Sequence, residues 1–259
     1  MFKAMHPTLS EAITINDYIH LKRSKPSTGP ARCPACNQPL SEKAVNDPDP
    51  AVKAHFAHVR NPKAPKCPIK AEGAIRYSVL TANFPDTQAA ADLRSSFFKN
   101  WTYHWHQFKK YVRTADIKDF TSALREIDNN GVWKYQNIQE HEVIIAMLAT
   151  RDFKPTKNSD GKVLRSRWVR FWFRSHVTSL QQFWNIGAGQ KDLIRAEYDL
   201  SERATKIKED KFLDFKVVTV DSTFLSNQDF SEAPRFVHVV MSERFPNMVA
   251  PPEPLEEKK

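Results

Sequence analysis

Hydrophobic residues recur every three or four positions from Glu72 to Phe153, and this pattern predicts that the segment is helical. Asp86 has the side chain of an N-cap and precedes one of the expected helices. Asn130-Gly131 is a typical signal for the end of another helix. The apolar run from Val143 to Leu148 indicates a helix that is buried.

Alternation of side-chain type replaces helical spacing after residue 160 and predicts strands. Residues 163–174 carry apolar side chains and arginines at both parities, so we expect one strand without a clean polar face. Its arginines either line a nucleic-acid channel or pair with acidic residues of neighbouring strands, because Arg suits both roles. A helix is expected at 175–184. Further strands are expected at 12–15, 192–200, 212–220 and 236–241.

All three cysteines of the chain lie between positions 33 and 67, and two histidines stand between the second and the third. Cys33 and Cys36 have the C-x2-C spacing that lets two thiolates face one metal ion. Cys67 and either His55 or His58 complete four ligands, which is the set of a structural zinc site. Ordinary reduced cysteines or a thioredoxin-type redox pair are the alternatives. The prolines around the C-x2-C pair indicate a loop and favour the metal site.

The segment HFAH at 55–58 predicts which histidine binds the metal. Side chains alternate along an extended segment, so Phe56 and His58 share one face and His55 lies on the other. The apolar ring of Phe56 is expected to pack inward and to place His58 beside the cysteines. In a tight turn, His55 can take its place instead. The predicted zinc ligands are Cys33, Cys36, His58 and Cys67.

A known family shares this arrangement of residues. A strand-like segment at Ala12–Ile15, C-P-A-C at 33–36, H-F-A-H at 55–58, Cys67 and a helix opening at Glu72-Gly73 follow one another. In this order they resemble the zinc-ribbon module of the competence protein CoiA-like family, over about a quarter of the chain. The resemblance implies a metal module that acts in DNA uptake, mobile-element transfer or phage defence. It also implies a link to nucleases, because the family includes chains with a nuclease domain.

These patterns predict an α+β protein in which a small N-terminal zinc ribbon precedes a mixed helical and β-sheet domain. The chain of 259 residues is long enough for a core of its own in the larger domain. The expected boundaries are 1–71 for the zinc ribbon and 72–247 for the α+β domain, helical over 72–153 and strand-rich over 160–245. Residues 248–259 are rich in proline and charge and are expected to be a disordered tail.

Positive charge is concentrated near the N-terminus. The formal net charge is +9, and residues 1–70 hold 11 Lys and Arg against 5 Asp and Glu. A local excess of cations favours contact with nucleic-acid phosphates, although solubility alone is an alternative reason for it. The cations that flank HFAH and precede Cys67 are the predicted nucleic-acid contacts: Lys53, Arg60, Lys63 and Lys66.

Enzyme motifs are scarce in this chain. It contains neither a glycine-rich phosphate-binding loop nor a G-x-S-x-G nucleophile motif. Asp199 ends one expected strand, and Asp214-Phe-Lys216 lies in the next. Restriction-type nucleases hold Mg²⁺ with carboxylates placed in this way, while a lysine orients the attacking water. Glu197 or Glu140 is the candidate for a third carboxylate.

Three functions are compatible with the sequence. The expected one is a zinc-containing nucleic-acid-binding protein, with DNA as the partner, in DNA uptake, mobile-element transfer or antiviral defence. The alternatives are a Mg²⁺-dependent nuclease of the CoiA-like type and an adaptor subunit that docks onto larger protein partners in a bacterial complex. The start of the chain lacks the apolar run of a signal peptide, and no stretch of 18 apolar residues occurs. We therefore expect a cytoplasmic protein with no membrane partner.

Overall fold

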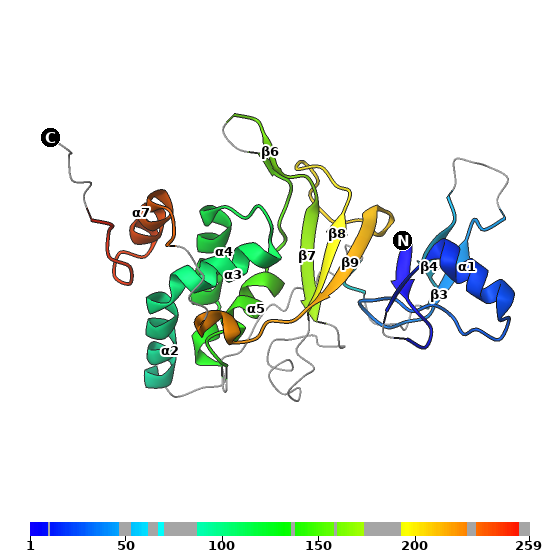
Figure 1. The fold of residues 1–259 in the computed structure, drawn as a ribbon, viewed down its shortest axis with the longest axis horizontal. Coiled ribbons are helices and arrows are strands. Elements are labelled where there is room, and N and C mark those ends of the chain that lie inside the picture. Colours follow the sequence, from blue (N-terminus) through cyan, green and yellow to red (C-terminus); the bar gives the residue numbers. More distant parts are fainter. Residues whose placement is uncertain are drawn as a thin grey trace. The chain divides into compact units, whose positions relative to one another are not determined.

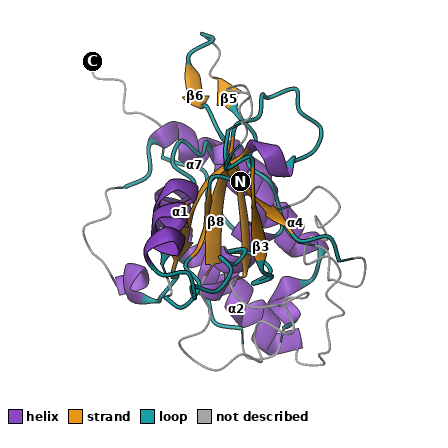
Figure 2. Cartoon of the chain, turned by 90° about the vertical axis from the view of Figure 1, so that its right-hand side faces the viewer, coloured by secondary structure: helices purple, strands orange, loops and turns teal. Residues whose placement is uncertain are grey.

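The computed structural model is built from helices and small antiparallel sheets, which confirms the α+β class (Figures 1 and 2). By its internal contacts the chain divides into two compact units. Unit 1 comprises the described residues within Met1–Arg76, Lys154–Thr178 and Ala188–Val218, and unit 2 those within Tyr77–Phe153 and Thr219–Lys259. The structure describes residues 1–9, 11–46, 53–61, 67–69, 87–135, 138–157, 160–173, 193–226 and 232–253.

The N-terminal part of unit 1 contains two small antiparallel pairs of strands and one helix. Strand β1 pairs with β2, and β3 pairs with β4. The Thr14 hydroxyl accepts a hydrogen bond from the Asp17 amide and caps helix α1, which the sequence pattern did not predict. Strand β2 ends at Thr14, one residue before the end of the expected strand at 12–15. The bounds are β1 Lys3–Met5, β2 Ala12–Thr14, α1 Ile15–Ser24, β3 Leu40–Lys43 and β4 His55–His58.

The rest of unit 1 is a three-stranded antiparallel sheet in the order β7-β8-β9, together with a hairpin of β5 and β6. The single strand expected over 163–174 is two strands, because the chain leaves the extended ladder between Arg165 and Trp168. Every residue of β7 is buried, including Arg170, as expected for a strand without a polar face. The bounds are β5 Thr156–Lys157, β6 Val163–Arg165, β7 Trp168–Phe173, β8 Leu193–Tyr198 and β9 Phe212–Val218.

The sheet and the N-terminal strands are joined by contacts within unit 1. Lys3 Nζ lies 2.8 Å from Asp214 Oδ1, which links β1 to β9. Arg170 of β7 donates a hydrogen bond of 3.1 Å to the carbonyl oxygen of Pro68, next to Cys67. These contacts join the described residues within Lys154–Thr178 and Ala188–Val218 to the N-terminal segment in one compact unit.

Unit 2 is helical in the part that the structure describes. The Asp116 side chain caps α4 at its start. Asn130 is the C-cap of α4 and Gly131, with φ of 61°, follows it, so the helix ends at the predicted Asn130-Gly131 signal. All eight residues of α5 are buried, which confirms the burial expected for the Val143–Leu148 run. The bounds are α2 Thr87–Lys99, α3 Trp101–Tyr111, α4 Ile117–Asn129, η2 Val132–Lys134, α5 Glu142–Ala149, η4 Thr223–Ser226 and α7 Arg235–Arg244.

The strand expected at 236–241 is wrong, because this segment lies in helix α7. Its valines favour a strand by propensity, but Val237 and Met241 are four residues apart and are both buried, which is the spacing of one helix face. Phe236 lies outside that face and is 65% exposed. Asp86, residues 72–84, the helix expected at 175–184 and the last six residues of the tail lie outside the described ranges.

Candidate metal centre

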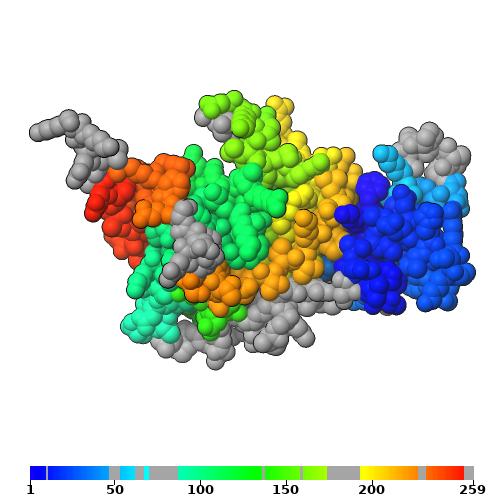
Figure 3. Space-filling view, in the orientation of Figure 1, coloured from blue at the N-terminus to red at the C-terminus, as the bar shows by residue number. Residues whose placement is uncertain are grey.

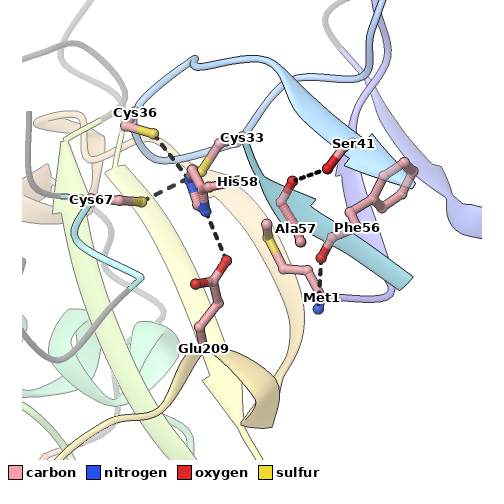
Figure 4. A network of polar contacts seen from close by, with 9 residues as sticks. All are labelled: Met1, Cys33, Cys36, Ser41, Phe56, Ala57, His58, Cys67 and Glu209. Carbon is pink, nitrogen blue, oxygen red and sulfur yellow. Dashed lines mark hydrogen bonds and ion pairs between the residues drawn. The ribbon is translucent and has the colours of Figure 1, made fainter. Parts of the chain in front are cut away.

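The three cysteines and one histidine converge in unit 1 (Figure 4). One ligand atom from each of Cys33, Cys36, His58 and Cys67 lies within 4.8 Å of all the others. The Sγ atoms of Cys33 and Cys67 are 3.6 Å apart, and Cys36 Sγ is 3.4 Å from His58 Nε2. A tetrahedron with metal–sulfur bonds of about 2.3 Å and metal–nitrogen bonds of about 2.0–2.1 Å has edges of about 3.8 and 3.6 Å. These two distances are close to the edges of such a tetrahedron, and all four donors lie near enough to one another to hold one metal ion.

The first two cysteines lie in a tight backbone turn. The Asn37 amide donates to the Cys33 carbonyl oxygen at 2.9 Å, and the Cys33 amide donates to the Gln38 carbonyl oxygen at 2.9 Å. Asn37 has φ of 55°, a left-handed conformation that Asn adopts more readily than most residues. This turn directs both thiols to the same side. Cys33 and Cys36 are 1% and 3% exposed, so they face the interior of the unit.

The hairpin of β3 and β4 brings the histidine to the thiols. Leu40, four residues after Cys36, pairs with His58 in the antiparallel register. Phe56 is 1% exposed and packs inward, as the alternation of HFAH predicted. The ring of His55 instead lies with Nδ1 2.9 Å from the Lys53 carbonyl oxygen. The structure thus places His58, and not His55, in the cluster.

A carboxylate from far along the sequence holds the histidine ring. Glu209 Oε1 lies 2.7 Å from His58 Nδ1, while Nε2 faces Cys36 (Figure 4). The carboxylate accepts a hydrogen bond from Nδ1–H, and this leaves Nε2 as the atom that can bind a metal. Glu209 stands in a short 3-10 helix, η3 Glu209–Lys211, just before β9. No sequence pattern points to Glu209, because 151 residues separate the two partners.

Burial and hydrogen bonds within the cluster shift the pKa values of its side chains. Burial raises the pKa of the Cys33 thiol, and its contacts with Cys36 and Cys67 add to this. Hydrogen bonds with Cys33 and Cys67 hold the pKa of the Cys36 thiol well below its usual range. Burial lowers the pKa of His58, but its bonds with Cys36, Cys67 and Glu209 outweigh this and raise the pKa to about 11. A divalent cation would favour thiolates and a neutral imidazole, so binding it would release protons.

Glu209→Gln is expected to lower the affinity of the cluster for Zn²⁺ by about 10–100-fold, because loss of a carboxylate partner frees the histidine ring and reduces its basicity. Competition with a chromophoric zinc chelator measures this change. Asp210→Asn is the matched control, since Asp210 is the exposed neighbour of Glu209. Equal affinities for both variants and the wild type would show that the carboxylate has no part in metal binding.

The predicted nucleic-acid contacts lie around the same hairpin. Lys53, just before β4, and Arg60, just after it, are both exposed. Lys63 and Lys66 lie outside the described residues. The two described cations therefore flank the strand that carries His58.

The acidic residues considered for a nuclease are held in ion pairs. Asp214 Oδ1 pairs with Lys3, as described above, and Asp199 Oδ1 lies 3.0 Å from Arg167 Nη1. Glu197 pairs with Arg195 at 2.5 Å. Lys216 lies opposite Arg195 in the β8–β9 register, and Glu140 belongs to unit 2. Among the described residues, the cluster of three cysteines and His58 is the one group of Cys, His, Asp and Glu spaced to hold a metal ion.

Comparisons with known proteins do not assign the chain to a family. No family model, curated protein or solved structure matches the chain. In the described part of the chain, no helix has both the length and the apolar character that crossing a bilayer requires. The chemistry of the site itself therefore carries the functional argument.

Proposed function

We propose that Cys33, Cys36, His58 and Cys67 hold a structural Zn²⁺ in a zinc-ribbon-like module, and that this module binds nucleic acid, with DNA as the expected partner. The observation that carries the zinc site is the convergence of three buried thiols and one imidazole nitrogen, whose ligand atoms all lie within 4.8 Å of one another. Soft thiolates with imidazole are the donors typical of zinc. Four protein ligands fill a tetrahedral shell, so no position is open for a reactive water.

The proposed contact with nucleic acid depends on the position of the exposed cations. Lys53 and Arg60 flank β4, and the zinc bound by His58 would hold this strand against β3. A metal that orders the backbone also orders the cations beside it and reduces the entropy lost on binding. The excess of cations in residues 1–70 and the resemblance to CoiA-like modules support the same proposal. A place in DNA uptake, mobile-element transfer or phage defence follows from that resemblance alone.

A salt titration tests the binding surface. Lys53→Ala/Arg60→Ala is expected to weaken binding to all duplex sequences alike and to flatten the plot of log affinity against log salt by about 1.8, at about 0.9 for each lost phosphate contact. Fluorescence anisotropy of a labelled duplex measures both effects.

The matched control is Lys118→Ala/Arg125→Ala, which removes two exposed cations of α4 in unit 2. This control should keep the wild-type salt slope. If both double variants flattened the salt slope by the same amount, the effect would come from net charge and not from Lys53 and Arg60. An adaptor protein would bind the duplex weakly, lose it near physiological salt and respond to neither substitution.

A further inference from the structure

A second cationic feature of unit 1 is a groove between the β5–β6 hairpin and the segment that follows β8. The cavity has a volume of about 560 Å³. In Figures 1 and 3 the hairpin, in lime green, and the segment after β8, in yellow, rise side by side at the top of the view. None of the residues that line the groove belongs to the metal cluster.

The walls of the groove carry more cations than acids. Lys157 of β5 and Arg203 of the segment after β8 are exposed on opposite walls. Arg165 of β6 also lines the groove and is only 6% exposed. A single acid, Glu202, stands among the lining residues. The charge of the lining therefore favours an anionic ligand.

Hydrogen bonds hold the two walls together. Arg165 Nε donates to the Lys154 carbonyl oxygen at 2.7 Å, which ties the two strands of the hairpin at its base. Lys154 Nζ donates to the carbonyl oxygen of Ala204 at 3.2 Å and lies 5.0 Å from the ring centre of Trp168. The hairpin is thus attached to the opposite wall and to the sheet beneath it. The groove is built before any ligand arrives, which lowers the entropic cost of binding.

The remaining lining is aliphatic. Pro155 and Leu200 are half-buried, and Val163 is 52% exposed although it is β-branched and apolar. A ligand that covers Val163 would bury apolar area in addition to contacting the cations. The ligand therefore needs anionic groups at the rim and flat or apolar groups at the floor.

We propose that this groove binds one or two nucleotides of a single-stranded nucleic acid. The phosphates lie against Lys157 and Arg203, and a base or sugar lies on Val163 and Leu200. A cavity of this volume is in the range of small-ligand sites and takes a single strand, but not the width of a duplex. This inference rests on the proposed nucleic-acid function and adds the type of strand that the chain recognises.

The test compares a labelled single strand of twelve thymidines with a labelled duplex of the same length. Lys157→Ala/Arg203→Ala is expected to flatten the salt slope for the single strand by about 1.4, at about 0.7 for each phosphate contact. Val163→Ser is expected to lower affinity for the single strand about threefold or more while it leaves the salt slope unchanged, because it removes apolar contact and no charge. The Lys118→Ala/Arg125→Ala control should change neither property.

The outcomes separate this inference from the proposed function. If the wild type binds the single strand and the Lys157→Ala/Arg203→Ala variant keeps its slope, the groove is not the site, and the proposed function stands. If the wild type binds neither form of DNA at low salt, the proposed function and this inference both fail. If instead a labelled peptide of alternating Glu and Leu binds and the same variant loses it, the groove serves an acidic protein partner and the inference is overturned.

Discussion

Cys67→Ser is expected to abolish metal binding and to unfold the N-terminal part of unit 1. Binding of a structural zinc is worth about 10–16 kcal/mol, while a whole domain is stable by only about 5–15 kcal/mol. The strands around the site are short, with three or four residues each, and bury few large side chains. The metal would therefore supply most of the stability of this region.

Elemental analysis and hydrogen exchange measure the two effects. The purified wild type should carry one zinc per chain, and Cys67→Ser should carry none and exchange its β3 and β4 amides rapidly. His58→Ala should behave in the same way. His55→Ala is the matched control and should keep both the metal and the protection. Zinc-free wild-type protein would refute the metal centre, and metal loss restricted to His55→Ala would mean that the other histidine is the ligand.

Acidification is expected to destabilise unit 2 through a pair formed by the buried His104 and the half-buried Glu140. His104 has no exposed surface, its ring stacks on Phe97 with ring centres 3.9 Å apart, and its Nε2–H donates to Glu140 at 2.8 Å. Ser96 and Asn100 donate to the same carboxylate at 2.5 and 2.9 Å. Glu140 thus accepts three hydrogen bonds. Hydrogen bonds to the ionised form of a carboxyl group favour that form.

The direction of the pH dependence follows from both pKa shifts. Burial lowers the pKa of His104 below its usual 6.5, so the unfolded state takes up the proton first and stability falls as pH drops below 6.5. Burial raises the pKa of Glu140, but its hydrogen bonds with His104, Ser96 and Asn100 outweigh this and lower the pKa from 4.5 to about 2. Its contribution is complete above pH 4.5 and is lost as pH falls toward 2. Both groups therefore weaken unit 2 in acid.

Glu140→Gln separates the contribution of the carboxylate from that of the histidine. At pH 7 we expect the variant to be less stable by about 1–3 kcal/mol, the range for leaving a buried donor without a good partner. Below pH 4.5 its stability should change less with pH than that of the wild type. Denaturant titrations of the full chain, read out by hydrogen exchange of the α4 and α5 amides, measure both.

Glu243→Gln serves as the control because Glu243 is an exposed carboxylate of α7 in the same unit. This variant should match the wild type at every pH. A Glu140→Gln protein as stable as the wild type at pH 7 would show that the His104–Glu140 pair contributes nothing to folding.

The candidate site was predictable where its residues are close in sequence. The C-x2-C spacing sets two thiols in one turn, and the alternation of HFAH assigns Phe56 inward and His58 toward the thiols. The same kind of local pattern located α4, with its C-cap at Asn130, and the buried α5. Each of these predictions depends on the backbone geometry of a few consecutive residues.

Local patterns failed where packing overrides propensity. The valines of 236–241 predict a strand, but the neighbours of Val237 and Met241 bury one helical face and make this segment α7. The arginine-rich run over 163–174 left two roles open. The tertiary structure directs Arg170 to the carbonyl of Pro68 and Arg165 to that of Lys154, so both arginines satisfy backbone carbonyl groups.

The sequence by itself identified the candidate donors of the metal centre, because the types and spacing of its cysteines and histidines are local properties, and the fold chose His58 over His55. The tertiary structure alone decided what surrounds that set. Glu209 reaches His58 across 151 residues, and Lys3 reaches Asp214 across 211. Such pairs form only when the β7-β8-β9 sheet folds against the N-terminal strands, and a sequence pattern carries no record of contacts made over these separations.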